Sequence, residues 1–130
     1  MSDSEKMKVL KHLAGGGLVT PVGKTKYRVK GSIVHVRFCS ANLKAPAKFK
    51  FNINPNTLSA DYELWVCGSS DCFYLMPIVF LRTIYDNRNT YIDRHHEEIR
   101  VVSVDTATDT VTYATEGRYE SIREYRRGEL

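Results

Sequence analysis

The sequence predicts an α+β fold: a mostly antiparallel or mixed sheet with an N-terminal helix and a short C-terminal helix. Apolar residues follow helical spacing near the N-terminus, and several later segments alternate apolar and polar residues with a period of two. Gly, Pro and Asn residues separate these segments, as is typical of short strands joined by turns. The chain has 130 residues, no internal repeat and no linker, so it is expected to form a single α+β domain over residues 1–130.

The N-terminal helix is expected to begin near Ser4, whose side chain can cap the first turn. Met7, Leu10 and Leu13 follow the spacing of one helical face, which indicates the side that packs on the sheet. Three consecutive glycines at 15–17 are expected to end the helix, because glycine accepts the left-handed backbone found there.

The strands are expected where β-branched and aromatic residues cluster between turn residues. They are predicted at residues 26–29, 32–38, 48–53, 61–67, 72–76, 99–104 and 110–114, with hairpins joining 61–67 to 72–76 and 99–104 to 110–114. Residues 77–81 begin with a proline and fit either a first helical turn or an extended strip. Residues 119–127 are predicted to form a short helix in which Ile122 and Tyr125 make the apolar contacts.

Charge is distributed unevenly along the chain, although the net charge is only +4. Residues 1–50 carry a net charge of +9 and hold every lysine, whereas residues 51–130 carry −5 and use only arginine as a cation. A basic half is the electrostatic feature that attracts polyanions such as nucleic acid.

Much of this positive charge lies on predicted strands. Lys24, Lys26, Arg28 and Lys30 follow a spacing of two, which predicts that they share one strand face, while Tyr27 points to the opposite face. The full set of candidate polyanion-binding residues is Lys24, Lys26, Arg28, Lys30, His35, Arg37, Lys44, Lys48 and Lys50. The alternative to polyanion binding is that these lysines simply face solvent. Edge strands often carry lysine because its charge prevents them from pairing with other chains.

Two other groups of side chains have types that occur in catalytic or metal sites. His95, His96, Glu97 and Glu98 are all possible metal ligands, but neighbours in sequence seldom converge on one ion, so an exposed loop is the expected alternative. Asp61 and Glu63 would share a strand face, where they either do acid–base work or simply face solvent. No catalytic residue, metal site or cofactor is predicted.

The three cysteines, Cys39, Cys67 and Cys72, show no metal-ligand spacing. Cys67 and Cys72 flank a predicted turn, so they could face each other. The N-terminus is polar, and no segment approaches the roughly 18 apolar residues of a membrane helix. We therefore expect a cytoplasmic protein with no membrane partner, and reduced thiols rather than a disulfide.

The order of predicted strands resembles the later part of the PD-(D/E)XK, or restriction-endonuclease-like, superfamily. The resemblance covers residues 32–81: a strand at 33–38, a basic loop, a Phe-rich strand at 49–53, the sequence Asp-Tyr-Glu-Leu-Trp-Val at 61–66, and a strand ending in Tyr-Leu-Met-Pro at 74–77. The family's Glu-x-Lys motif would align with His35-Val36-Arg37, and residues 6–60 contain no acidic residue to act as the upstream metal ligand. The resemblance therefore implies a degenerate member that binds DNA without cutting it, with His35 and Arg37 contacting phosphate.

These observations predict a non-catalytic domain that binds nucleic acid or another polyanion through a lysine-rich strand face. One alternative is a protein-interaction or homodimerising adaptor domain, in which strands such as 49–53 and 101–104 offer edges for strand addition. The other is a small ligand-binding or enzymatic protein with a pocket lined by Asp61, Glu63 and several of the eight tyrosines.

Overall fold

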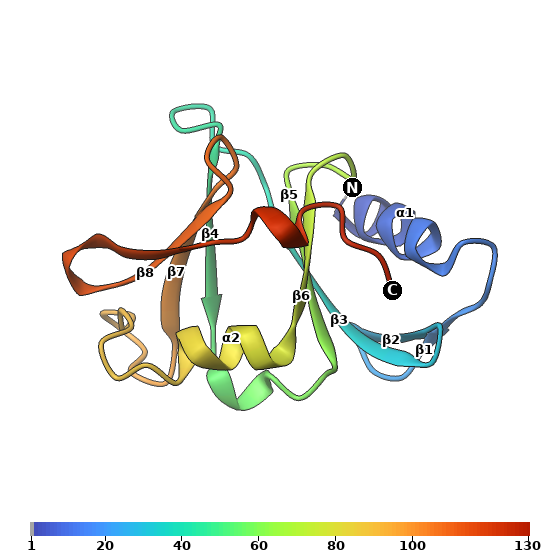
Figure 1. The fold of residues 1–130 in the computed structure, drawn as a ribbon, viewed down its shortest axis with the longest axis horizontal. Coiled ribbons are helices and arrows are strands. Elements are labelled where there is room, and N and C mark those ends of the chain that lie inside the picture. The colour runs from blue at the N-terminus through green and yellow to red at the C-terminus, as the bar shows by residue number, and fades with distance from the viewer. Residues whose placement is uncertain (1) are drawn as a thin grey trace.

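The computed structural model describes residues 2–130, which form two helices and two sheets (Figure 1). The first sheet has five strands in the order β1-β2-β3-β5-β6. Its strands are β1 (Val19–Pro21), β2 (Lys26–Val29), β3 (Ser32–Cys39), β5 (Tyr62–Cys67) and β6 (Phe73–Pro77). Only the central pair, β3 and β5, is parallel, so the sheet is mixed.

The second sheet has four antiparallel strands in the order β4-β7-β8-β9. Its strands are β4 (Lys48–Ile53), β7 (Arg100–Asp105), β8 (Thr110–Ala114) and β9 (Arg118–Ser121). The described residues also form three short 3-10 turns, at Pro55–Thr57, Thr115–Gly117 and Arg123–Tyr125. The α+β class predicted from the sequence is confirmed.

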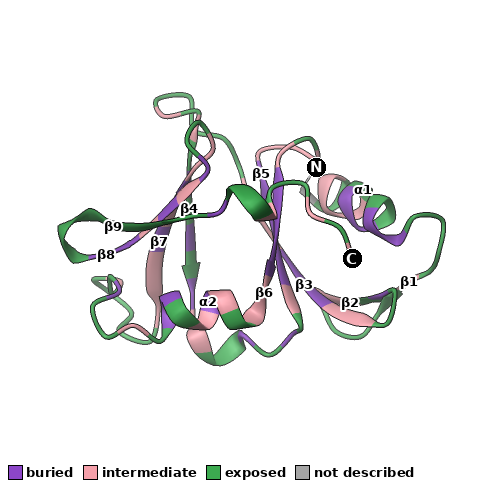
Figure 2. Ribbon diagram, viewed as in Figure 1, coloured by how far each residue is buried: buried purple, intermediate pink, exposed green. Residues whose placement is uncertain are grey.

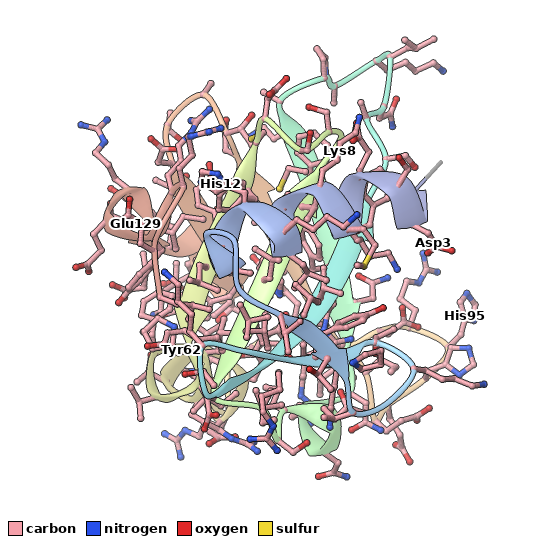
Figure 3. The ribbon with its side chains drawn as sticks, turned by 90° about the vertical axis from the view of Figure 1, so that its right-hand side faces the viewer. Asp3, Lys8, His12, Tyr62, His95 and Glu129 are labelled. Atoms are coloured by element: carbon pink, nitrogen blue, oxygen red, sulfur yellow. The ribbon has the colours of Figure 1, made fainter. Side chains whose placement is uncertain are left out.

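The first sheet is covered on both faces, which explains why β5 and β6 are buried along most of their length (Figure 2). Helix α1 (Ser2–Ala14) lies across one face, where Leu10 and Leu13 pack on Val34, Val36 and their neighbours. Figure 3 looks onto this helix. The opposite face packs against the inner face of the second sheet and against α2 (Ile78–Tyr85).

Phe51 and Trp65 join the two sheets at the centre of the second core. Phe51 projects from β4 and stacks on Trp65 of β5, with ring centroids 4.3 Å apart and an interplanar angle of 13°. Tyr85 of α2 meets the edge of the same indole. Strict alternation in β4 produces this arrangement, because Phe49, Phe51 and Ile53 face inward while the residues between them are exposed.

Most predicted elements are present, and strands β2 and β4 begin and end at the predicted residues. Lys30 and Gly31 form a two-residue hairpin in which both φ angles are positive, at 49° and 81°. Residues 78–85 adopt the helical alternative. Helix α1 begins at residue 2, so Ser4 lies inside its first turn instead of capping it.

The predicted short C-terminal helix over residues 119–127 is not what the structure contains. Residues 118–121 form strand β9, and only residues 123–125 make one 3-10 turn. Ile122 is buried and Tyr125 packs on the same core, as the sequence pattern indicated. The spacing of three between Ile122 and Tyr125 fits a helix. Residues 118–121 form a strand instead, because the free edge of β8 offers them backbone hydrogen-bond partners.

Candidate functional site

The predicted polyanion-binding residues do not form one surface. Lys26 and Arg28 pair in register with His35 and Ile33, so they share one face of the first sheet. Tyr27 points to the opposite face, as predicted, and it packs against the core beneath α1. Lys24 precedes β2, and Lys44 is exposed in the loop before β4; Lys48 and Lys50 belong to β4 in the other sheet.

Lys30 does not share the strand face on which it was predicted to lie with Lys26 and Arg28. Its left-handed backbone interrupts the alternation of β2. The Lys30 side chain lies beside Gly15, just after the end of α1, where it lines a small cavity with His12 and Glu129. This face of β2 therefore holds only Lys26 and Arg28 of the four cations expected there. The amine of Lys26 already donates a hydrogen bond to the Ser59 hydroxyl.

His35 and Arg37 are tied to a buried carboxylate. Glu63 lies opposite His35 in the parallel β3–β5 pair and its side chain is 0% exposed. Arg37 Nε donates to Glu63 Oε1 over 2.6 Å, and His35 Nδ1 lies 2.9 Å from Glu63 Oε2. Trp65 Nε1 also donates to Oε1, over 3.3 Å, and Arg37 Nη2 donates to the Thr57 hydroxyl over 3.0 Å.

The electrostatics of this cluster favour an ionised carboxylate. Burial is the largest single influence on the pKa of Glu63 and acts to raise it, but the hydrogen bonds and charges of His35 and Arg37 together lower the pKa below its ordinary value. Because Glu63 is out of reach of solvent, it lines no pocket that a substrate could enter. Asp61 is exposed and accepts a hydrogen bond from the Ile33 backbone, so the two acids do not act as a pair.

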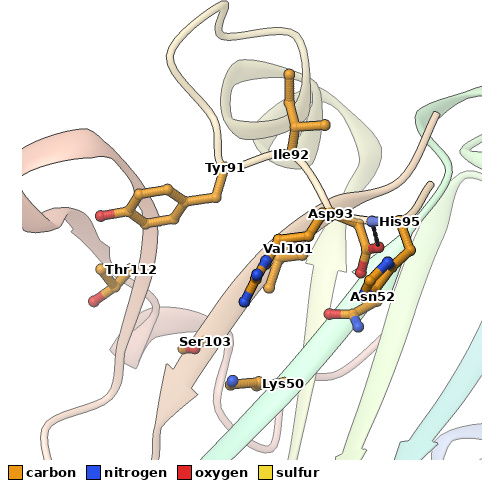
Figure 4. A pocket seen from close by; sticks show the side chains of 10 residues that line it. Lys50, Asn52, Tyr91, Ile92, Asp93, His95, Val101, Ser103 and Thr112 are labelled. Atoms are coloured by element: carbon orange, nitrogen blue, oxygen red, sulfur yellow. Dashed lines mark hydrogen bonds between the residues drawn. The ribbon is translucent and has the colours of Figure 1, made fainter. Parts of the chain in front are cut away.

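A groove lies on the outer face of the second sheet, where the loop after α2 folds back over the strands (Figure 4). Its volume is about 420 Å³. Strands β4, β7 and β8 form the floor, and residues 91–95 form the wall. The lining residues are Lys50, Asn52, Tyr91, Ile92, Asp93, Arg94, His95, Val101, Ser103 and Thr112.

Backbone hydrogen bonds hold the wall of this groove in place. The Tyr91 amide donates to the Tyr113 carbonyl, and the Val101 amide donates to the Tyr91 carbonyl, each over 2.9 Å. Asp93 Oδ1 accepts from the backbone amides of His95 and His96. The hydrogen bond from the His95 amide is the main cause that lowers the pKa of Asp93, and the His96 amide acts in the same direction. The Asp93 carboxylate is therefore ionised and already accepts two backbone hydrogen bonds.

Two cations at the groove have no acidic partner among residues 2–130. Lys50 and Arg94 make no ion pair within 4.0 Å there, whereas Lys48, two residues along the same strand, lies 2.8 Å from Asp105. His95 is exposed beside them. Lys50 is thus the one predicted polyanion-binding residue that the structure places in this groove.

The strand register extends the floor of the groove into a row of side chains across the sheet. Lys50, Ser103, Thr112 and Tyr119 are successive partners on β4, β7, β8 and β9, so they share the outer face. Tyr119 is 63% exposed and Tyr91 is 39% exposed. With strands about 4.8 Å apart, the backbones of Lys50 and Tyr119 are separated by about 14 Å.

Sequence patterns identified only part of this groove. Residues 95–98 were expected to be either metal ligands or an exposed loop. His95 and His96 are exposed, and within residues 2–130 no group of three or more His, Cys, Asp or Glu side chains is arranged to hold a metal ion. Tyr91, Arg94 and Tyr119 had no distinguishing local pattern. Tyr91 and Arg94 reach the groove through the folding of a loop, and Tyr119 shares the outer sheet face because edge strand β9 pairs with β8.

No family model, curated protein or solved structure matches this chain. The resemblance to the PD-(D/E)XK superfamily therefore stays a prediction. No helix within residues 2–130 is both long enough and apolar enough to cross a membrane.

Proposed function

We propose that the protein is a non-catalytic binding domain for single-stranded nucleic acid, and that it binds in the groove on the outer face of the second sheet. The observation that carries this proposal is the combination of two unpaired cations, Lys50 and Arg94, with the exposed rings of Tyr91 and Tyr119 on one sheet face. Cations neutralise phosphates, and exposed aromatic rings on a sheet stack on unpaired bases.

The size of this face suits a short run of nucleotides. The row from Lys50 to Tyr119 spans about 14 Å, and strands about 4.8 Å apart offer successive contacts along it. Asn52, Ser103 and Thr112 add hydrogen-bonding groups to the floor. All three are polar, and Asn52 is exposed while Ser103 and Thr112 are half-buried, which suits a site that binds a flexible, charged polymer.

The test is fluorescence anisotropy with a labelled oligothymidylate at low and moderate salt. Lys50→Ala and Arg94→Ala are each expected to weaken binding and to lower the slope of log K against log salt by about 0.7, the value for one phosphate contact on a single strand. Arg28→Ala is the matched control, because Arg28 is an exposed cation on a strand of the other sheet.

Two results would overturn this proposal. Absence of binding at the lower salt concentration would exclude nucleic acid as the ligand. A loss of binding in Arg28→Ala, with none in Lys50→Ala, would move the site to the β2 face predicted from the sequence.

Self-association is the second candidate function, and the topology of the second sheet favours it. Residues 101–104 do not offer the edge predicted from the sequence, since β7 lies between β4 and β8. Residues 49–53 belong to β4, which is an outer strand as predicted, and β9 is the outer strand at the other side of the sheet. All four residues of β9 are exposed, so we propose it as the edge at which a second copy adds. Light scattering at two salt concentrations tests this, and a monomer at both would contradict it.

A further inference from the structure

Cys67 and Cys72 occupy opposed positions at the end of the β5–β6 hairpin. The preceding pair, Val66 and Phe73, is in register, and the Cys67 amide donates to the Cys72 carbonyl over 2.8 Å. Opposed residues of an antiparallel pair have Cα atoms about 4.5 to 5.5 Å apart, within the range of about 4.4 to 6.8 Å that a disulfide requires. Both thiols are free, and they are close enough to share a side-chain hydrogen bond.

The two cysteines open onto a cavity that a guanidinium also lines. The cavity has a volume of about 430 Å³, and Cys67, Cys72 and Arg126 are among its lining residues. Arg126 Nη2 lies 4.0 Å from Cys72 Sγ. Arg126 is fixed there by Asp109, at 2.8 Å, and by the Thr106 carbonyl, at 3.0 Å. A small molecule that enters this cavity therefore meets a thiol and a positive charge together.

The surroundings make the two thiols unequal. The hydrogen bond from Cys67 lowers the pKa of Cys72 to about 7, and the charge of Arg126 acts in the same direction against burial and Asp109. The same hydrogen bond, followed by burial, raises the pKa of Cys67. The other titratable or charged groups that face the pair are Cys39 of β3, Tyr74 of β6 and Arg127 near the C-terminus.

We propose that Cys72 is a modification site that reacts with small disulfides such as glutathione disulfide, and that Cys67 is its resolving thiol. The Cys72 thiolate attacks one sulfur of the small disulfide, so that a mixed disulfide forms and one thiolate leaves. Cys67 then gives up its proton to the departing thiolate and attacks Cys72 Sγ, which releases the second thiol. The protein dithiol is oxidised to a disulfide, and one small disulfide is reduced to two thiols.

The proposal can be tested by mass spectrometry on the reduced 130-residue chain after exposure to glutathione disulfide. We expect a product that has lost two hydrogen atoms and carries no glutathione. Trypsin separates the cysteines, since cleavage after Lys50 and Arg82 leaves Cys67 and Cys72 in one peptide and cleavage after Arg37 and Lys44 leaves Cys39 in another. The crosslink is therefore expected within the peptide 51–82.

Three serine variants assign the roles. Cys67→Ser keeps a hydrogen-bond donor beside Cys72 and is expected to trap one glutathione on Cys72. Cys72→Ser is expected to leave Cys67 unmodified, with circular dichroism confirming that the variant is folded. Cys39→Ser is the matched control and is expected to form the disulfide at the wild-type rate.

The pH dependence of alkylation distinguishes a thiol activated by its surroundings from one that is merely accessible to solvent. The rate of alkylation at Cys72 is expected to reach half its maximum near pH 7, and Cys67→Ala is expected to move that midpoint upward because it removes the donor. Reaction of Cys39 as fast as Cys72 would overturn the proposal. So would a Cys67→Ala variant whose midpoint does not move, or a wild-type product in which glutathione stays attached.

Discussion

Arg37 Nε lies 2.6 Å from the Glu63 carboxylate, which is completely shielded from solvent in the middle of the first sheet. The pair joins two parallel strands that are distant in sequence, and His35 and Trp65 contact the same carboxylate. A buried charge needs such partners because the interior solvates it poorly. This cluster therefore links β3 to β5 through side chains, and it occupies the two side chains that were expected to contact phosphate.

Glu63→Gln is expected to lower the free energy of unfolding by about 3 to 5 kcal/mol, because it leaves the half-buried guanidinium of Arg37 without its counter-charge. Urea denaturation of both proteins measures this difference. Asp86→Asn is the control, since Asp86 forms an exposed pair with Arg82 at 3.4 Å, and its loss should cost about 1 kcal/mol or less. Equal effects of the two substitutions would mean that the buried cluster has no special role.

Acid is expected to destabilise the protein partly through this same carboxylate. The pKa of Glu63 is lower in the folded protein than its ordinary value of 4.5, so the unfolded chain takes up a proton first as the pH falls. Its contribution to stability is complete above pH 4.5 and is lost as the pH falls toward the folded pKa. Urea midpoints measured from neutral pH to below pH 4.5 should decline less steeply in Glu63→Gln than in the wild type. Parallel curves would contradict this assignment.

The sequence predicted elements well where local alternation decides them. Strand β4 begins and ends as expected because Phe49, Phe51 and Ile53 need one buried face. Residues 119–121 were wrongly predicted to be helical, since the strand that they form depends on an available edge of β8 and not on their own pattern. Propensity is a weak guide where a tertiary partner competes with it.

The candidate site was harder to predict than the strands, because contacts between residues distant in sequence form it. Strand alternation placed Lys48 and Lys50 on an exposed face correctly, but the pattern of a single strand does not reveal which sheet that strand joins. The burial of Glu63 follows from its register with His35 across 28 residues of sequence. Arg94 reaches the groove only because the loop after α2 folds over β7, which no periodicity indicates.

Phe51→Ala is expected to destabilise the protein by about 3 to 5 kcal/mol, because it opens a cavity against Trp65 where the two sheets meet. Trp65 is the only tryptophan, so its fluorescence reports unfolding of this junction directly. Lys50→Ala is the neighbouring control on the outer face of the same strand and should change stability by no more than about 0.5 kcal/mol. A Phe51→Ala variant as stable as wild type would show that the stacked rings do not hold the sheets together.

Tyr119 separates base stacking from simple charge attraction in the proposed nucleic-acid site. Its ring is 63% exposed on the outer sheet face, at the opposite end of the row that begins with Lys50. If a base stacks there, Tyr119→Ala should weaken binding of an oligothymidylate by about 1 to 3 kcal/mol, or roughly 5- to 150-fold in Kd.

Tyr119→Phe keeps the aromatic face and should bind nearly as well as the wild type, and Val79→Ala controls for the loss of an exposed apolar side chain on α2. The stacking contribution should also persist at higher salt, because it does not depend on counterion release. If Tyr119→Phe and Tyr119→Ala lose equal affinity, the hydroxyl and not the ring makes the contact. If neither loses affinity, the ligand does not extend across β9 and the binding surface ends at β8.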